Sequence, residues 1–189
     1  TQFTPAVVPM SDVLESARTL PHNLDAERSV LGAVMLRNDA INQATEVIDS
    51  DDFFREAHRL IFDKMIGLSE RGLAIDLVTL KEELSRAGLL ESVGGPAYIA
   101  SLVDGVPRAT NVEYYARIIK EKATRRSLIA SASKIVAEAY DSDQEADEIL
   151  DTAERTIFEI ADGSLRSGFV PLSALVDSSW ATIEQLQER

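Results

Sequence analysis

Residues 108–162 read RATNVEYYARIIKEKATRRSLIASASKIVAEAYDSDQEADEILDTAERTIFEIAD, a stretch without glycine or proline. Because these two residues are the strongest breakers of regular structure, the stretch predicts long helices. It contains two capping boxes, since Thr110 and Ser142 are each followed by a glutamate three positions later. We therefore expect helices over about 111–140 and 145–162, folded back on each other as an antiparallel helical hairpin.

Apolar residues recur at helical spacing in both predicted helices, which indicates the seam where the helices meet. The first helix contributes Leu128, Ala132, Ile135 and Ala139, and the second Ala146, Leu150, Ala153, Ile157 and Ile160. Ile129, Val136 and Tyr140 lie beside this seam, and Phe158 lies off it. Either the rest of the chain covers these side chains, or a second copy or another protein does. Val136, Tyr140 and Phe158 are the candidates for self-association.

The segment before the hairpin has short apolar patterns separated by turn-forming residues such as Gly94-Gly95-Pro96. Helix starts are predicted at Pro21 to Asn23, at Ser50-Asp51-Asp52 before the next apolar stripe, and at Asp76 or Thr79. Val78-Thr79 alone hints at a strand, and it is too short to build a sheet. The predicted fold class is therefore all-α, with a compact multi-helix head, an antiparallel hairpin and a C-terminal linker helix.

The predicted head spans 21–110 and the predicted hairpin 111–163. Residues 1–20 contain two prolines and one short helical pattern, so we expect a mobile tail. Residues 164–171 are predicted to be a flexible linker, and 172–189 an amphipathic helix. A lone helix of this length is marginal in water, so its apolar face must dock on another surface. That linker-helix docking face comprises Leu172, Leu175, Val176, Trp180, Ile183 and Leu186.

Acidic side chains outnumber basic ones by 32 to 19, which gives a formal net charge of −13. Such a surface repels polyanions, so DNA or RNA binding by the whole surface is disfavoured. A basic strip is the local exception, and it consists of Arg117, Lys120, Lys122, Arg125 and Arg126. It contains no aromatic stacking partner, so a solvated face or salt bridges to the acid-rich segment 145–154 fit it better than a nucleic-acid groove.

Motifs that carry chemistry are not apparent in the sequence. The nearest approach to a phosphate-binding P-loop, residues 163–168, lacks the lysine and the hydroxyl that such a loop needs. His22 and His58 are the two histidines and cysteine is absent, so a metal site would need an unusual carboxylate set. We expect no catalytic, cofactor-binding or metal site in this chain, and we interpret His58 as a hydrogen-bonded structural residue. Without a membrane-length apolar run, we expect a cytoplasmic protein.

Five motifs in order resemble the amino-terminal domain of the DnaB-type replicative DNA helicases. They are LPHNLDAE with VLGA (20–33), DFF with HRLIF (52–62), IDLVTL (75–80), GGPAYI (94–99) and NVEYYA (111–116). The resemblance implies a helical head, a hairpin, and a linker helix leading to a RecA-type motor that would hold ATP and Mg²⁺ in a 5′–3′ DNA helicase. It also implies hairpins paired into a trimer-of-dimers collar, a linker helix docked on the adjacent subunit's motor, and recruitment of the primase C-terminal domain.

For primase docking the candidates are Tyr98, Ile129 and Ile135, which we expect near the junction of head and hairpin. Tyr98 combines an apolar ring with a polar tip, as suits a partly wet interface. Ile135 and Ile129 lie about 120° apart on one helix, so one can serve the seam while the other faces a partner. Two other interpretations remain open. An independent enzyme would need a cluster of ionisable residues in a pocket, and a single-stranded DNA binder would need the basic strip exposed along a groove.

Overall fold

The fold is described from a computed structural model. The structure describes residues 19–104, 111–140 and 145–165, and the side chains of these residues as far as 161. These residues form seven α-helices and one short 3₁₀ helix, with no strand among them, which confirms the all-α prediction. The predicted caps Thr110 and Ser142 and almost all of the predicted tail lie outside the described residues. So does the linker-helix docking face from Leu172 to Leu186.

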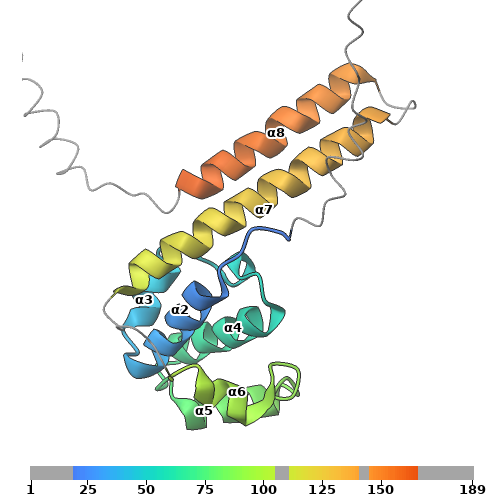
Figure 1. Ribbon diagram of the computed structural model, residues 1–189. Helices are drawn as coiled ribbons and strands as arrows, with labels where there is room; N and C mark the ends of the chain where they lie inside the picture. Colours follow the sequence, from blue (N-terminus) through green and yellow to red (C-terminus); the bar gives the residue numbers. More distant parts are fainter. Residues whose placement is uncertain (1–18, 105–110, 141–144, 166–189) are drawn as a thin grey trace, which may run out of the picture.

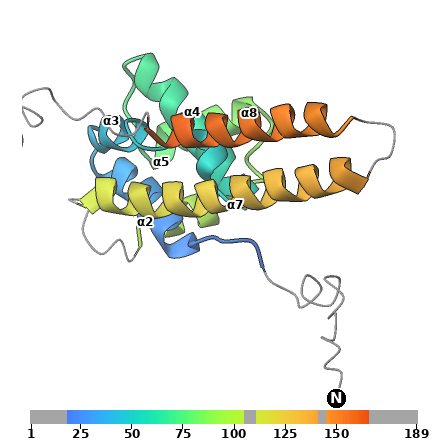
Figure 2. The same cartoon turned by 90° about the horizontal axis from the view of Figure 1, so that it is seen from above.

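The helices are arranged as a head and a projecting pair of rods (Figure 1). The head contains α2 (Leu24–Leu36), α3 (Ala40–Thr45), η1 (Ser50–Asp52), α4 (Glu56–Glu70), α5 (Leu77–Arg86) and α6 (Gly95–Ser101). The rods are α7 (Val112–Tyr140) and α8 (Ala146–Leu165), which run side by side in both Figure 1 and Figure 2. The predicted hairpin is therefore present, with its second helix continuing to Leu165. None of the described helices is long and apolar enough to cross a membrane.

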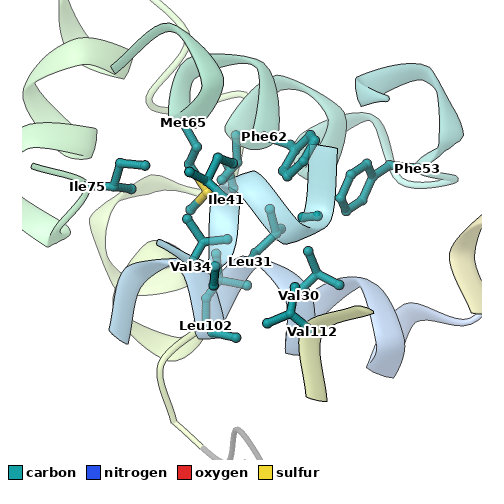
Figure 3. Packing of buried hydrophobic residues seen from close by; sticks show 14 of the residues in the cluster. Val30, Leu31, Val34, Ile41, Phe53, Phe62, Met65, Ile75, Leu102 and Val112 are labelled. Atoms are coloured by element: carbon teal, nitrogen blue, oxygen red, sulfur yellow. The ribbon is translucent and has the colours of Figure 1, made fainter. Parts of the chain in front are cut away.

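The hydrophobic core lies in the head, around α2. Val30, Leu31 and Val34 of α2 have no exposed surface, and they meet side chains of α3, α4 and the first turn of α7 (Figure 3). Phe53 and Phe62 pack there with ring centroids 4.9 Å apart. Burial of apolar side chains of this size contributes about 1.5–3 kcal/mol each, so the head carries most of the fold's stability.

Capping residues set the helix starts in the head. The Asn23 side chain accepts a hydrogen bond from the backbone N–H of Ala26, which confirms the predicted start of α2. Asp76 caps α5 in the same way, and the Val78-Thr79 stretch lies inside this helix rather than in a strand. The predicted start at 50–52 was placed too early. These residues close their own 3₁₀ turn through an Asp49 and Asp52 capping box, and α4 begins at Glu56.

The predicted hairpin seam is wrong in part, because the two helices are rotated from the expected register. Ile135, Ala153 and Ile160 are half-buried as expected, whereas Leu128 is 42% exposed and Leu150 58% exposed. Small polar residues take their place between the helices. The half-buried positions include Thr124, Ser131, Ile135 and Glu138 on α7, and are Ile149, Thr152, Ala153, Thr156 and Ile160 on α8.

Candidate protein-interaction surfaces

The hairpin carries exposed apolar side chains on both of its helices. We define this hairpin apolar face by four side chains of α7 and two of α8. They are Leu128, Ile129, Val136 and Tyr140, with Leu150 and Ile157, and they are 42–86% exposed. Of the predicted self-association residues, Val136 and Tyr140 therefore lie on one surface.

Val136, Leu150 and Ile157 share a side of the hairpin because of the way each helix is turned. Val136 follows the half-buried Ile135, and Leu150 and Ile157 follow the half-buried Ile149 and Thr156, each by one position. One residue is about 100° of rotation in an α-helix. The helices α7 and α8 run side by side in opposite directions (Figure 2). The same sense of rotation in each therefore brings both exposed stripes to the same side of the hairpin.

Phe158, the third predicted self-association residue, lies on the back of α8. It is 71% exposed and shares its stripe with Glu154, one turn before it, and Asp151, two turns before it, rather than with Leu150 and Ile157. Its side chain therefore points away from the hairpin apolar face. The geometry does not bring Phe158 together with Val136 and Tyr140.

Helix α8 has little packing of its own. No side chain between Ala146 and Ala161 is buried, although the helix is 20 residues long. By contrast, α7 buries Val112, Ala116, Ile119 and Ala123, all in its first half, where it packs against the head. The far half of the hairpin is thus a pair of helices in contact mainly with each other.

The basic strip pairs with carboxylates close to it. Arg117 and Arg125 bind glutamates one turn away on α7, and Lys120 Nζ lies 2.9 Å from Asp52 Oδ2 of η1. The predicted salt bridges to the acid-rich segment 145–154 are absent from the described residues. The reason is the antiparallel register, because Lys120 and Thr124, in the first half of α7, line one cleft with Thr156 and Glu159 of the second half of α8. The segment 145–154 lies further along the hairpin.

Arg126 fastens the hairpin to the head by contacts that its sequence neighbours do not make. Its guanidinium donates to the backbone oxygens of Pro21 and Asp52, and its Cζ lies 5.7 Å from the centre of the Phe54 ring. The other face of the junction is closed by His22, stacked on Phe54 at 4.3 Å. Burial lowers the pKa of Arg126, but Glu27 and Asp52 oppose that shift and a guanidinium stays charged.

Tyr98 ends a chain of polar groups that begins in the core. Glu27 Oε2 lies 2.6 Å from His58 Nδ1, and His58 Nε2 lies 2.6 Å from the Tyr98 hydroxyl. Glu27 and His58 are 1% and 0% exposed, while Tyr98 is half-buried. The prediction that His58 is a hydrogen-bonded structural residue is confirmed. The sequence carried no signal that Glu27, 31 residues away, would be its partner.

Two arginines flank the Tyr98 ring. Arg55 Cζ lies 4.6 Å and Arg28 Cζ 5.9 Å from the ring centre. Both bind neutral oxygens, since Arg55 Nη1 donates to the Tyr98 hydroxyl and Arg28 Nη2 donates to Ser101 O. We call Tyr98, Arg28 and Arg55 the tyrosine–arginine surface. It offers an aromatic ring and cationic N–H donors within an otherwise acidic protein.

The turn before α6 fixes the position of Tyr98. Gly94 has φ +101°, and a Cβ added to it would lie 2.9 Å from the Tyr98 Cβ. A larger residue there is disfavoured both by the left-handed backbone and by this contact. The predicted turn at Gly94-Gly95-Pro96 therefore also seats the aromatic ring.

The three predicted primase-docking residues lie on different parts of the molecule. Tyr98 belongs to α6, which packs against α5 on the side of the head away from the hairpin (Figure 1). Ile129 is 44% exposed on the hairpin apolar face, and Ile135 is half-buried between α7 and α8. The structure does not bring them into one patch on a single chain.

One cleft of about 360 Å³ lies where η1, α7 and α8 meet. Hydroxyls line it, together with the already paired Lys120 and Asp52. Within the described residues no three histidine or carboxylate side chains gather as a metal site. The candidate partner-binding surfaces among the described residues are the hairpin apolar face and the tyrosine–arginine surface.

Comparison with known proteins accounts for this architecture. The family model described as "DnaB-like helicase N terminal domain" matches residues 19–121, which include the whole head and the start of α7. The chain belongs to this family. The resemblance predicted from the five sequence motifs is therefore confirmed, and the family's helical domain is the fold described above.

The curated relatives are much longer than this chain. It is 40% identical over 180 residues to the replicative DNA helicase DnaC of Bacillus subtilis, a match that covers 95% of this chain and 39% of the relative. It is 43% identical to the replicative DNA helicase DnaB of Treponema pallidum, covering 87% of this chain and 37% of the relative. The chain thus spans less than half the length of these helicases.

Solved structures agree at the level of the domain. The crystal structure of the N-terminal domain of DnaB helicase from Mycobacterium tuberculosis superposes with a TM-score of 0.70 at 38% identity, covering 75% of this chain and 99% of that one. A structure of a DnaB-like replicative helicase and its interactions with primase gives a TM-score of 0.62 at 22% identity, covering 86% and 35% of the two chains. The latter likeness supports the shared fold.

Proposed function

We propose that this DnaB-family domain is an assembly module that pairs with a second copy through its hairpin apolar face. The single observation that carries the proposal is α8, a long helix with no buried side chain up to Ala161 and with Leu150 and Ile157 exposed beside Val136. Helices in proteins gain most of their stability from packing an apolar face against another surface. A second hairpin laid on this face supplies that packing.

Pairing of two copies fits the symmetry of the surface. A two-fold interface uses the same patch on both subunits, and an apolar stripe that runs along two antiparallel helices can face its own copy. Two hairpins would then form a four-helix arrangement with an apolar interior. Following the family resemblance, we propose that three such pairs build the collar of a hexameric helicase.

A pair of matched substitutions tests this interface. Val136 lies on the hairpin apolar face with 45% exposure, and Val78 lies on α5 of the head with 74% exposure. Val136→Glu places a charge inside the proposed interface, so we expect a lower solution mass by light scattering. Val78→Glu adds the same charge outside it and is expected to leave the mass unchanged. Equal masses for the two variants and the original chain would speak against pairing through this face.

The second proposed role is docking of the primase C-terminal domain at Tyr98, Ile129 and Ile135. It is supported by the exposed Ile129 and by the tyrosine–arginine surface, whose aromatic and arginine composition is typical of interface hot spots. Because a single chain keeps α6 away from the hairpin, we propose that the head of one copy and the hairpin of another line the docking site. A substitution of Ile129 would then affect both the pairing of two copies and primase docking, whereas a substitution of Tyr98 would affect docking alone.

The docking role is tested by titrating the cognate primase C-terminal domain onto the chain. Tyr98→Ala removes the ring and is expected to weaken binding about tenfold or more, as loss of a hot-spot aromatic does. Leu73→Ala is the control, because Leu73 is an exposed apolar residue of the head outside the tyrosine–arginine surface. Equal affinities for both variants would remove Tyr98 from the docking site.

We further propose that the chain itself is non-catalytic, and that ATP and Mg²⁺ are held by a motor domain reached through the linker helix. Direct DNA contact is proposed to be weak, since the cations of the basic strip are engaged by carboxylates or carbonyl oxygens of η1 and α7. Calorimetry with ATP checks the first statement. A salt-dependent affinity for single-stranded DNA would contradict the second.

A further inference from the structure

The buried end of the polar chain fixes where one proton lies. Backbone N–H groups of Phe54 and Arg55 donate to the two oxygens of Glu27, at 2.8 and 3.4 Å. Both oxygens therefore act as acceptors, as those of a carboxylate do. The third contact, His58 Nδ1 at 2.6 Å, must then be a donor. His58 carries a proton on Nδ1.

The outer end of this series of hydrogen bonds determines where the Tyr98 hydroxyl proton lies. Arg55 Nη1 donates to the Tyr98 hydroxyl oxygen at 2.9 Å, because a guanidinium has no acceptor to offer. His58 Nε2 lies 2.6 Å from the same hydroxyl. If Nε2 bore a proton, the Tyr98 hydroxyl oxygen would accept from both His58 and Arg55, and the phenol proton would be left to point elsewhere. If Nε2 is bare, the hydroxyl donates to it, and the three hydrogen bonds along the chain are consistent with one another.

We infer that Glu27 and His58 are positioning residues for the tyrosine–arginine surface. They hold the Tyr98 ring in place and direct its hydroxyl proton inward, onto His58 Nε2. A docked partner then meets an aromatic ring and the free N–H groups of Arg28 and Arg55, and no hydroxyl donor. The matching partner groups are acceptors, above all carboxylates, which bind arginine in a bidentate manner. This last statement rests on the proposed docking role of Tyr98, whereas the proton assignment does not.

Nitrogen-15 NMR of the histidine rings tests the proton assignment in the unmodified chain. Only His22 and His58 contribute signals, and a His22→Gln variant assigns them. At neutral pH we expect His58 Nδ1 to give a protonated-type shift and Nε2 an unprotonated-type shift. In Tyr98→Phe the Nε2 signal should move while His22 stays in place. An imidazolium pattern, or a proton on Nε2 alone, would overturn the inference.

The statement about partner binding is tested by comparing two variants at Tyr98. Tyr98→Phe keeps the ring and removes a proton that faces inward, so we expect primase C-terminal domain affinity within about twofold of the original, well under the tenfold that 1.4 kcal/mol represents. A tenfold loss in Tyr98→Phe would show that the hydroxyl serves the partner and would overturn the positioning role. If Tyr98→Ala also binds like the original chain, the docking role fails, and the NMR result still decides the proton assignment separately.

Discussion

Lys120 Nζ lies 2.9 Å from Asp52 Oδ2, and this ion pair joins the hairpin to the head. Arg126, further along the same helix, donates to the backbone oxygen of Asp52 and to that of Pro21. The first half of α7 is therefore held to the head by polar side-chain contacts as well as by its buried apolar residues. The far half of the hairpin extends beyond this anchor, where its exposed apolar residues remain accessible to another chain.

Removal of the Arg126 side chain should loosen this anchor. Arg126→Ala leaves two half-buried carbonyl oxygens without their donor, so we expect a loss of about 1–3 kcal/mol in the free energy of unfolding. Among the described residues, the neighbouring Arg125 pairs with Glu121 on the exposed surface of α7. Arg125→Ala should therefore stay within about 0.5 kcal/mol of the original chain. Urea denaturation of both variants makes the comparison, and equal losses would show that Arg126 is not a specific anchor.

The cap of α5 should make stability depend on acid. A hydrogen bond from the backbone N–H of Thr79 holds the pKa of Asp76 below its usual value of 3.8. Burial opposes this shift, and hydrogen bonds from the Val78 N–H and the Thr79 hydroxyl add to it. The ionised form is thus favoured in the folded state. Its contribution is present above the unfolded pKa and is lost as pH falls through the folded pKa.

Two substitutions isolate this effect. Asp76→Ala removes the cap and should cost about 1 kcal/mol at neutral pH, whereas Asp76→Asn keeps a capping oxygen that does not titrate. In denaturation measured from pH 6 down to about pH 2, the free energy of unfolding of the original chain should fall toward that of Asp76→Ala. An advantage that persists unchanged at the acid end would rule out the ionised cap.

Ile129 and Ile119 lie on the same helix and should respond differently to truncation. Ile119 is 2% exposed, so Ile119→Ala is expected to cost about 2–5 kcal/mol. Ile129 is 44% exposed, so Ile129→Ala should leave the melting temperature nearly unchanged while it weakens binding of the primase C-terminal domain. A large loss of stability with intact primase binding would return Ile129 to the core.

The sequence predicted the parts of the fold that depend on local chemistry. Asn23 and Asp76 cap helices because their side chains reach backbone N–H groups two or three residues ahead. Likewise, the glycine- and proline-free stretch gave two long helices. The rotation of α8 on α7 was not predictable, because Ile135 and Val136 are both apolar and spacing alone does not tell which stripe faces the partner helix and which faces outward.

The candidate surfaces were predicted less well for a related reason. Tyr98, Val136 and Tyr140 were identified from their residue types and positions, and the last two lie on the hairpin apolar face. The contacts that give Tyr98 its setting come from Glu27 and Arg55, on other elements of the head. Such non-local contacts leave no periodic pattern in a single sequence. Phe158 was assigned to the same surface because its neighbours on the back of α8 could not be known in advance.

Sedimentation equilibrium of the unmodified chain over a concentration series tests the central claim most directly. If the hairpin apolar face binds a second copy, the mass should rise with concentration from that of one chain, 20.7 kDa, to at least twice that value. A mass that stays at 20.7 kDa at every concentration would contradict the proposal that this face is covered by a second copy.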